Sequence, residues 1–333
     1  MKRIAINGFG RIGRLVFRIM ENDPEIEVVA INDLTDSEQL AYLLKYDTNH
    51  RVYQEEVSFD EDGIIVGNRH IHVYSETDPS KLPWDELGID LVFECTGRFV
   101  DVTKAHAHIE AGAKKVIISA PAKGDIKTIV YHVNDDILDG TEEIISAASC
   151  TTNCLAPVLS VLEKEYGIEK GYMTTIHAYT NDQVTLDVAH KKGIQARRGR
   201  ACGMNIVPTS TGAAKAIGKV IPSLNGKMKG GAMRVPVSDG SLVDLTLQLK
   251  KNVTVSEIND LFKAKVNETL HYTDDPIVSS DIISSTCGAT VDGNLTDVLD
   301  GENGQLVKVI AWYDNEMGYS AQMVRTAKKF ISL

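Results

Sequence analysis

The sequence predicts an α/β protein of two domains, the first built on a doubly wound parallel sheet. Three observations lead to this expectation. The chain has 333 residues, enough for two domains that each bury a core. A glycine-rich turn near the N-terminus separates an apolar strand from a helix. Continuous apolar runs then recur along the first half, as parallel strands buried on both faces should show.

Composition and charge limit the classes to which this protein can belong. Hydrophobic residues make up 43% of the chain and charged residues 24%, which is ordinary for a globular protein in water. The net charge of -11 argues against partners that are polyanions, such as nucleic acid or anionic membranes. No signal peptide or long apolar run can be read, and five cysteines suit a reducing compartment. We therefore expect a cytoplasmic protein without a structural disulfide.

The first strand, helix and second strand carry a dinucleotide-binding pattern. An apolar strand at residues 3–6 leads into a G-x-G-x-x-G turn, and helical spacing follows through residues 11–20. The glycines of this turn are Gly8, Gly10 and Gly13. The second strand, residues 26–33, ends in Asp33, which lies 20 residues beyond Gly13 (33 minus 13).

Each part of this pattern has a physical role in binding a dinucleotide. Glycines let the backbone approach a pyrophosphate, and the helix N-terminus offers free N–H groups and the positive end of its dipole. Asp33 would accept hydrogen bonds from ribose hydroxyls and repel a 2′-phosphate. The pattern therefore predicts a site for NAD rather than NADP, with an ordinary βαβ unit without ligand as the alternative.

The later strands of the first half end in small residues. The runs at residues 90–97 and 115–120 bring Thr96 and Ser119 to the carboxyl ends of strands, where ligands bind in doubly wound sheets. Two histidine pairs, His70/His72 and His106/His108, are expected to be solvent-exposed. Neither they nor the cysteines show the recurring short spacings of a zinc site, so no metal is predicted.

Two cysteines four residues apart receive different roles. Helical spacing after Cys150 puts this residue at a helix N-terminus, where a thiolate is stabilised, and puts Cys154 on the apolar face. Lowering a thiol pKa by about two units costs about 2.7 kcal/mol, whereas a helix end supplies roughly 0.3–1 kcal/mol. His177, at the end of an expected strand, is the candidate for the remainder and for proton transfer. The spacing leaves open a purely structural role for His177.

Five motifs resemble those of phosphorylating glyceraldehyde-3-phosphate dehydrogenases and occur in the same order. They are INGFGRIGR, SCTTNCLAP, HAYTNDQ, PTSTGAAKA and WYDNEMGYS. The resemblance covers essentially the whole chain. It implies an NAD-binding Rossmann domain over residues 1–149 and an α+β catalytic domain with a mixed, largely antiparallel sheet over residues 150–314. It also implies a C-terminal helix, residues 315–333, that returns to the first domain, and a homotetramer.

The resemblance also implies a reaction. Cys150 would attack the aldehyde of glyceraldehyde 3-phosphate, hydride would pass to NAD, and inorganic phosphate would release 1,3-bisphosphoglycerate from a thioester. His177 is implied as thiol activator and base. Cofactor contacts are implied for Gly8, Gly10, Arg11, Ile12, Gly13, Asp33, Thr96, Ser119, Asn315 and Tyr319. Substrate or phosphate contacts are implied for Ser149, Thr151, Thr180, Asp182, Arg198, Thr211, Gly212 and Arg234.

Some departures from the family pattern leave questions open. Arg197 competes with Arg198 for the site of the attacking phosphate. Ala189 stands where many NAD-specific members have proline, and Thr77 replaces an arginine near the adenosine end, so the strictness of NAD over NADP stays open. Erythrose-4-phosphate dehydrogenase, favoured less by HAYTNDQ, and a catalytically silent NAD-binding protein are the alternatives. The physiological direction and additional surface roles also stay open.

Overall fold

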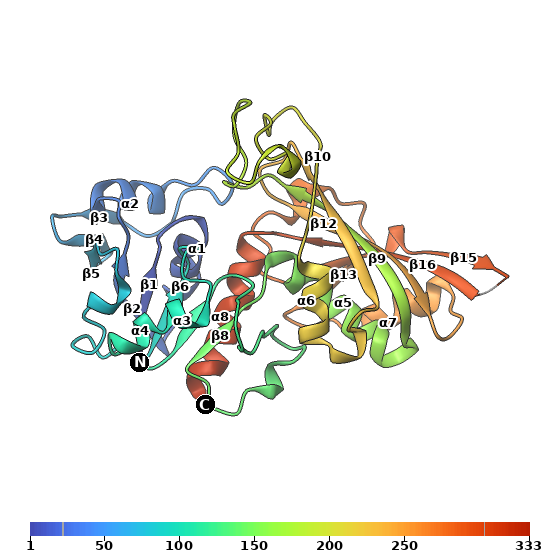
Figure 1. The fold of residues 1–333 in the computed structure, drawn as a ribbon, viewed down its shortest axis with the longest axis horizontal. Helices are drawn as coiled ribbons and strands as arrows, with labels where there is room; N and C mark the ends of the chain where they lie inside the picture. Colours follow the sequence, from blue (N-terminus) through green and yellow to red (C-terminus); the bar gives the residue numbers. More distant parts are fainter. Residues whose placement is uncertain (22, 303) are drawn as a thin grey trace. The chain divides into compact units, whose positions relative to one another are not determined.

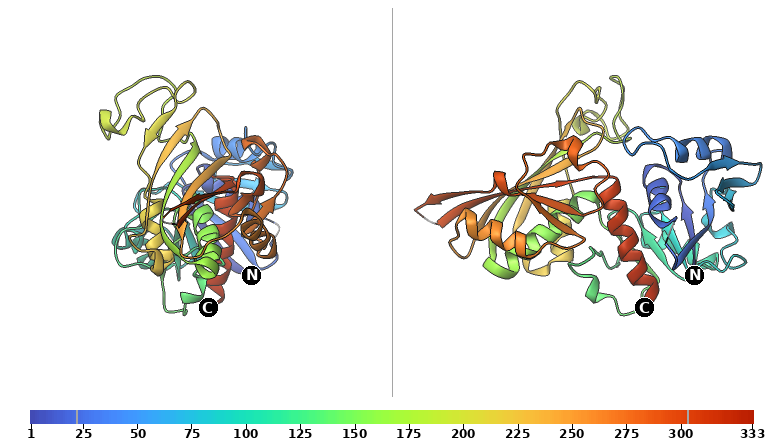
Figure 2. Two further views of the ribbon diagram at one scale, coloured as in Figure 1. Left: turned by 90° about the vertical axis from the view of Figure 1, so that its right-hand side faces the viewer. Right: turned by 180° about the vertical axis from the view of Figure 1, so that it is seen from behind.

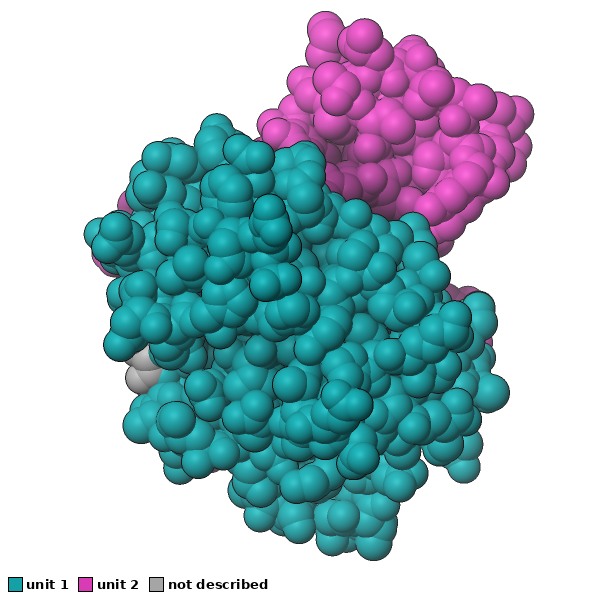
Figure 3. Space-filling view, turned by 90° about the vertical axis from the view of Figure 1, so that its left-hand side faces the viewer, with its two compact units in different colours: residues 1–149, 323–333 teal, residues 150–322 magenta. Residues whose placement is uncertain are grey.

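The computed structural model describes residues 1–21, 23–302 and 304–333, which form two compact units. Unit 1 comprises residues 1–149 and 323–333, and unit 2 comprises residues 150–322 (Figure 3). None of the described helices is both long and apolar enough to cross a lipid bilayer. All five cysteines are free thiols.

Unit 1 is built around a sheet that has eight strands among the described residues (Figure 1). Its order is β3-β4-β5-β2-β1-β6-β7-β8. The strands are β1 Lys2–Asn7, β2 Ile26–Asn32, β3 Val57–Phe59, β4 Gly63–Val66, β5 Arg69–Tyr74, β6 Leu91–Glu94, β7 Val116–Ile118 and β8 Ile144–Ser146. From β5 to β8 all pairs are parallel, whereas β3 and β4 form an antiparallel edge. The strand order reverses at β1, so a ligand is expected beyond the carboxyl ends of the strands around it.

The sequence of unit 1 explains why its central strands are buried. Strands β6, β7 and β8 carry Ile, Val, Leu and Phe in continuous runs, and all their residues are buried. The helices of this unit are α1 Arg11–Met20, α2 Ser37–Lys45, α3 Val102–Ala105 and α4 Ala107–Glu110. Helix α1 buries Leu15, Val16 and Phe17 and has no side-chain cap at its N-terminus. The first-turn N–H groups of such a helix have no hydrogen-bond partner within the helix itself.

Unit 2 contains a second, mixed sheet with the order β10-β11-β9-β12-β16-β14-β13, and β15 pairs with β16. Its strands are β9 Ile168–Ala178, β10 Val207–Thr209, β11 Met228–Val235, β12 Ser241–Leu249, β13 Leu270–Thr273, β14 Ala289–Asp292, β15 Asp297–Gly301 and β16 Gly304–Tyr313. The pairs β11–β9 and β13–β14 are parallel and the other pairs are antiparallel.

The helices that contact this second sheet are α5 Cys150–Tyr166, α6 Ala213–Val220 and α7 Val255–Ala264. Helix α8 Met317–Ser332 follows β16 and continues into unit 1. Helix α5 contacts the central strands β9, β12 and β16, and α6 contacts both α5 and β11, so the two helices lie on one face of the sheet (Figure 2). Helix α5 is buried from Thr151 through Ser160, which makes it the core helix of unit 2.

The predicted fold class is confirmed, and one prediction about histidines is wrong. A doubly wound α/β unit and a mixed, largely antiparallel sheet are both present. His108, however, is fully buried rather than solvent-exposed. The helical stretch breaks at His106 into α3 and α4, which turns His108 inward while His106 stays exposed.

Candidate functional site

The predicted thiol and imidazole are in contact. Cys150 is the first residue of α5, and His177 is the penultimate residue of β9, a central strand beneath that helix. Cys150 Sγ lies 3.4 Å from His177 Nε2, although 27 residues separate them. Cys154, one turn along α5, is completely buried with its Sγ 3.8 Å from the Ala311 carbonyl oxygen. The two cysteines thus occupy the environments predicted for them.

Two neighbours of His177 Nδ1 favour opposite tautomers of the ring. Arg234 Nη1 lies 2.6 Å from His177 Nδ1 and 2.7 Å from the Ala178 carbonyl oxygen. His177 Nδ1 also lies 2.7 Å from that carbonyl. A guanidinium only donates, so the Arg234 contact favours a proton on Nε2, whereas the carbonyl only accepts and favours a proton on Nδ1. In the second form the Nε2 lone pair faces Cys150 Sγ.

Burial shifts the pKa of both groups toward their neutral forms. Burial raises the pKa of the Cys150 thiol, against the opposing charge of Arg234 and hydrogen bonds from Thr151. Burial, aided by the Arg234 charge, lowers the pKa of His177 to about 3. Both directions run against the expectation of a thiol whose pKa is lowered by the helix end and His177. The resting pair is a thiol and a neutral imidazole, which suits proton transfer during the reaction rather than before it.

Arg234 also offers an unused donor. Its Nε is buried and has no hydrogen-bond partner within the part of the chain that the structure describes. A buried guanidinium donor without a partner is costly unless a ligand, such as an anion, satisfies it. Thr180 lies in the turn that follows β9, where its carbonyl accepts from the Gln183 N–H at 2.8 Å.

Arg198 is a second cationic group whose position is fixed by neighbouring side chains. Arg198 forms an ion pair with Asp182, and its Nε donates to Thr209 Oγ1 at 3.1 Å. Burial alone would raise the pKa of Asp182, but the hydrogen bond and charge of Arg198 outweigh it and lower that pKa. Arg197, by contrast, is exposed and adopts a left-handed backbone with φ of 58°. Of the two candidates, Arg198 is therefore the one held by more side-chain contacts.

Helix α6 begins close to the residues that hold Arg198. Gly212 is its N-cap without a side-chain cap, and a Cβ at this glycine would meet no heavy atom within 4 Å. Thr211 Oγ1 accepts from the Ala213 N–H at 3.2 Å. The start of α6 is thus open toward an anion. The hydroxyl of Thr151 is instead 3.0 Å from the Tyr313 hydroxyl, and Thr151 also hydrogen-bonds the Cys150 thiol through its side chain and its backbone.

Asn315 is connected to the end of β9. Ser241 Oγ donates to Asn315 Oδ1 at 2.6 Å and accepts from the Ala178 N–H at 3.0 Å. Asn315 is buried, and its fixed Oδ1 turns its NH₂ group away from Ser241. Tyr319, also buried, lies in the first turn of α8.

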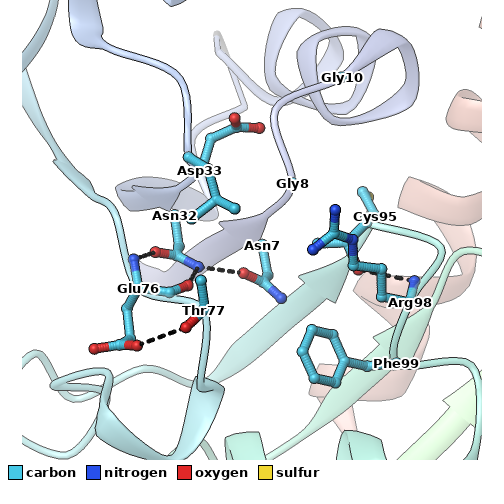
Figure 4. A pocket seen from close by; sticks show the side chains of 12 residues that line it. Asn7, Gly8, Gly10, Asn32, Asp33, Glu76, Thr77, Cys95, Arg98 and Phe99 are labelled. Atoms are coloured by element: carbon cyan, nitrogen blue, oxygen red, sulfur yellow. Dashed lines mark hydrogen bonds between the residues drawn. The ribbon is translucent and has the colours of Figure 1, made fainter.

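A pocket of unit 1 lies over the predicted dinucleotide turn (Figure 4). It is lined by Asn7, Gly8, Gly10, Asn32, Asp33, Leu34, Glu76, Thr77, Cys95, Thr96, Arg98 and Phe99. Gly8 has φ of 93°, and a Cβ there would lie 2.8 Å from the Thr96 nitrogen. A Cβ on Gly13 would lie 2.2 Å from the Gly8 carbonyl oxygen, whereas one on Gly10 would enter open space. The turn is thus tight at two glycines and open at the third, which fits a pyrophosphate at the uncapped end of α1.

Asp33 stands at the carboxyl end of β2 and lines this pocket. One of its carboxylate oxygens accepts from the Phe9 N–H at 2.8 Å and the other from the Thr35 N–H at 3.0 Å. These two bonds hold the carboxylate in place while each oxygen keeps a free lone pair. A ribose diol fits such an acceptor, and a 2′-phosphate does not.

The other predicted cofactor residues are less directly placed. Arg11 turns its guanidinium to Asp47, with Nη2 3.1 Å from Oδ1, so Arg11 and its neighbours Ile12 and Gly13 would contribute through the first-turn N–H groups of α1. Ser119 follows β7 and is half-buried, and Ser149 precedes Cys150. Asn7, Asn32 and Glu76 line the pocket without having been predicted. For Asn7 and Asn32 the available signal was a polar residue at the end of an apolar strand, directly before Gly8 or Asp33. Glu76 had no comparable signal.

The fold and the two constellations define a class of protein: a dinucleotide-dependent oxidoreductase with a thiol beside an imidazole. Comparison with known proteins narrows this class. A family model for the glyceraldehyde 3-phosphate dehydrogenase NAD binding domain matches residues 2–102, and one for the C-terminal domain matches residues 149–315. The chain belongs to the glyceraldehyde 3-phosphate dehydrogenase family.

Curated relatives match the chain over its full length. A glyceraldehyde-3-phosphate dehydrogenase from Clostridium pasteurianum is 56% identical over 333 residues, covering 100% of this chain and 99% of its own. One from Clostridium acetobutylicum is 55% identical with the same coverage. One from Streptococcus pyogenes is 53% identical over 332 residues, covering 99% of this chain and 98% of its own.

Proposed function

We propose that this chain oxidises D-glyceraldehyde 3-phosphate to 1,3-bisphosphoglycerate with NAD and inorganic phosphate, the phosphorylating reaction of glycolysis. The observation that carries this proposal is the 3.4 Å contact between Cys150 Sγ and His177 Nε2 at the start of α5. The full-length similarity to the clostridial and streptococcal dehydrogenases supports it.

Cys150 is the proposed nucleophile. Its sulfur forms a bond to the aldehyde carbon while His177 Nε2, 3.4 Å from that sulfur, accepts the thiol proton and donates it to the carbonyl oxygen, which becomes the hydroxyl of a hemithioacetal. The backbone N–H of Cys150 would donate to that oxygen as its charge develops. His177 Nε2 then accepts the hydroxyl proton while hydride leaves the same carbon, and a thioester remains on Cys150. NAD, when bound, supplies the acceptor for that hydride.

Inorganic phosphate completes the proposed reaction. One of its oxygens attacks the thioester carbonyl, the C–S bond breaks, and the acyl phosphate leaves with the thiol restored. Arg234 and Thr180 are proposed for the substrate phosphate, which the unpartnered buried Nε of Arg234 supports. Arg198 with Asp182 is proposed for inorganic phosphate. The start of α6 and the start of α5 would assist through Thr211, Gly212, Ser149 and Thr151.

Residues of each unit are proposed separately as contacts of NAD. Gly8, Gly10 and the first turn of α1 would receive the pyrophosphate, and Asp33 the adenosine ribose. Thr96 and Ser119 would lie near the cofactor as ends of β6 and β7. Asn315, whose amide is fixed by Ser241, is proposed to hold the nicotinamide carboxamide near Tyr319.

Domain roles, assembly and location complete the proposal. Residues 1–149 would bind NAD, residues 150–314 would carry out the chemistry, and residues 315–333 would return to the first domain. A cytoplasmic location and a homotetramer are also proposed. What supports assembly with another subunit is that the loop between β9 and β10 exposes Leu186 by 76%, Ile194 by 89% and Met204 by 87%. Side chains this apolar are better covered by a neighbouring subunit than by water.

One set of assays tests the function. Purified protein is mixed with NAD, phosphate and either glyceraldehyde 3-phosphate or erythrose 4-phosphate, and NADH is followed by absorbance. We expect phosphate-dependent turnover with the triose to exceed that with the tetrose. Faster turnover of erythrose 4-phosphate would replace the proposed substrate, and no NADH with either aldehyde would favour a silent NAD-binding protein.

A further inference from the structure

A series of buried hydrogen bonds runs beneath the dinucleotide pocket of unit 1. It joins Trp84, His108, Glu94, Asn7 and Asn32, and each of these residues is at most 4% exposed. Asn7 and Asn32 line the pocket, whereas Trp84, His108 and Glu94 do not. Figure 4 shows the pocket end of the series, where Asn7, Asn32 and Glu76 are joined. We refer to these bonds as the buried network.

Glu94 is the centre of the network and is surrounded by donors. Its Oε2 accepts from Asn7 Nδ2 at 2.5 Å and from His108 Nε2 at 3.1 Å. Its Oε1 accepts from the Thr96 N–H at 2.9 Å and from the Thr96 hydroxyl. A buried carboxylate is tolerated when donors satisfy both of its oxygens in this way.

The network has only one consistent direction of donation. Trp84 Nε1 can only donate, and it lies 3.0 Å from His108 Nδ1, so Nδ1 accepts and the ring proton is on Nε2. That proton is donated to Glu94. Asn7 Nδ2 and His108 Nε2 are 3.3 Å apart because both donate to the same carboxylate oxygen.

The direction continues from Glu94 to the pocket wall. Since Asn7 turns its NH₂ group to Glu94, its Oδ1 points the other way and accepts from Asn32 Nδ2 at 2.7 Å. Asn32 forms two hydrogen bonds with the backbone of Glu76: its Oδ1 accepts from the N–H at 2.8 Å and its Nδ2 donates to the carbonyl at 2.9 Å. Reversing either amide would place donor against donor and acceptor against acceptor.

Part of the network lies at or just after the carboxyl ends of four neighbouring strands. Asn7 ends β1, Asn32 ends β2, Glu94 ends β6, and Glu76 follows β5 by two residues. These four strands are neighbours in the order β5-β2-β1-β6. Their carboxyl ends form the crevice in which a doubly wound sheet binds its ligand. The network therefore ties together the segments that make the pocket wall.

We propose that Trp84, His108 and Glu94 are positioning residues for NAD binding: they set the polarity of the Asn7 and Asn32 amides and the backbone at Glu76 and Thr96. None of the three touches the pocket, and the inference rests on the proposed NAD-binding function. A pocket whose wall can adopt alternative polarities would spend part of its time in forms that bind NAD poorly, which weakens the observed affinity.

Two substitutions at one position test the polarity argument. His108→Leu removes both the donor and the acceptor, whereas His108→Gln supplies an NH₂ for Glu94 and a carbonyl for Trp84. Isothermal titration calorimetry with NAD on the purified full-length protein should show a roughly tenfold higher Kd for His108→Leu, as expected when buried donors lose their partner. His108→Gln should recover most of the affinity. His106→Leu is the matched control on the exposed side of the same stretch and should bind as wild type does.

Two further variants keep the test decisive if His108→Leu fails to fold. Glu94→Gln places an NH₂ among donors, and Trp84→Phe removes only the first donor while keeping an aromatic ring. Both should raise the Kd for NAD while thermal melting still shows one folded protein. Wild-type affinity in folded Glu94→Gln and Trp84→Phe overturns the positioning role. Failure of the wild-type protein to bind NAD would overturn the proposed function and this inference together.

Discussion

Arg234 and His177 are register partners on the parallel strands β11 and β9, and Arg234 Nη1 lies 2.6 Å from His177 Nδ1. The Ala178 carbonyl, 2.7 Å from the same nitrogen, competes with this contact for the tautomer of the ring. Arg234 has two tasks in the proposed reaction, since the same guanidinium is proposed to receive the substrate phosphate. With the guanidinium engaged by that phosphate, a ring proton on Nδ1 would be donated to the Ala178 carbonyl, and Nε2 would accept protons in the reaction.

The first prediction concerns Arg234 and the reactivity of Cys150. Its positive charge lowers the pKa of Cys150 against the effect of burial. Arg234→Leu should therefore raise that pKa and move alkylation to higher pH, whereas Arg234→Lys should shift the profile less. The measurement is the rate at which neutral iodoacetamide alkylates Cys150 across pH, followed by mass spectrometry of its peptide because Cys95 and Cys202 are also partly accessible. An unchanged profile in Arg234→Leu would show that the guanidinium does not act on the thiol.

The second prediction separates the two cysteines of α5. Cys150→Ser should reduce turnover by about a thousandfold or more, because a hydroxyl is a far weaker nucleophile and leaving group than a thiol. Its NAD affinity should stay close to that of wild type. Cys154→Ser should keep turnover and cost about 1 kcal/mol of unfolding free energy, since the buried hydroxyl can still donate to the Ala311 carbonyl. Greater loss of activity in Cys154→Ser than in Cys150→Ser would reverse the assignment.

The third prediction is a pH dependence of stability caused by His177. Its pKa falls from an unfolded value near 6.5 to about 3 in the folded protein. Between these values the unfolded chain binds a proton that the folded chain does not, so stability is full above pH 6.5 and declines as the pH falls toward 3. At pH 5 the loss is about 2 kcal/mol.

Urea unfolding of wild type and His177→Asn at pH 7.5 and pH 5 measures this contribution. Other groups titrate in both proteins, so the loss on going to pH 5 is compared between them. The wild type should lose about 2 kcal/mol more than the variant. Equal losses would mean that His177 can be protonated in the folded protein without cost.

The fourth prediction concerns the choice of cofactor. Asp33→Ala should weaken NAD binding and relax discrimination against NADP, because a 2′-phosphate would no longer face a fixed carboxylate. Ala189→Pro is a useful comparison, since this position differs from many NAD-specific relatives. The ratio of kcat/KM for NAD and NADP is the measurement. A ratio that changes in Ala189→Pro but not in Asp33→Ala would move the selection from Asp33 to the loop.

Local sequence patterns predicted much of this molecule. The glycine turn, Asp33 at the end of β2 and Cys150 at the start of α5 all follow from spacings of a few residues. The contacts of the His177 ring were not predictable in the same way. Arg234 meets His177 only because β11 pairs in parallel with β9, 57 residues apart.

The burial of individual side chains could not be predicted from local sequence patterns either. His108 is two residues from an exposed histidine, and its partner Asn7 is 101 residues away. Burial against such distant groups also decides the direction in which the pKa of His177 and Cys150 moves, and the helix end alone could not predict that direction. These long-range contacts are set by how the sheets assemble.

The last prediction separates the two proposed anion sites. Arg234→Leu should raise KM for glyceraldehyde 3-phosphate about ten- to a hundredfold, the worth of one charge-assisted hydrogen bond. Unphosphorylated glyceraldehyde does not need that contact at its third carbon, so its KM should change much less. An equal rise in KM for both aldehydes would assign Arg234 a structural role only.

Arg198→Leu should instead act after hydride transfer. Arg198 is held by Asp182 and Thr209 beside the start of α6, whereas Arg197 is exposed, so Arg197→Leu is the matched control. In rapid mixing with excess aldehyde and NAD, the first burst of NADH should keep its rate in Arg198→Leu, because thioester formation does not require phosphate. The following steady phase should slow and need more inorganic phosphate to saturate. If Arg197→Leu slows the steady phase and Arg198→Leu does not, Arg197 binds the attacking phosphate, and Arg198 serves only to fix Asp182 and the loop around it.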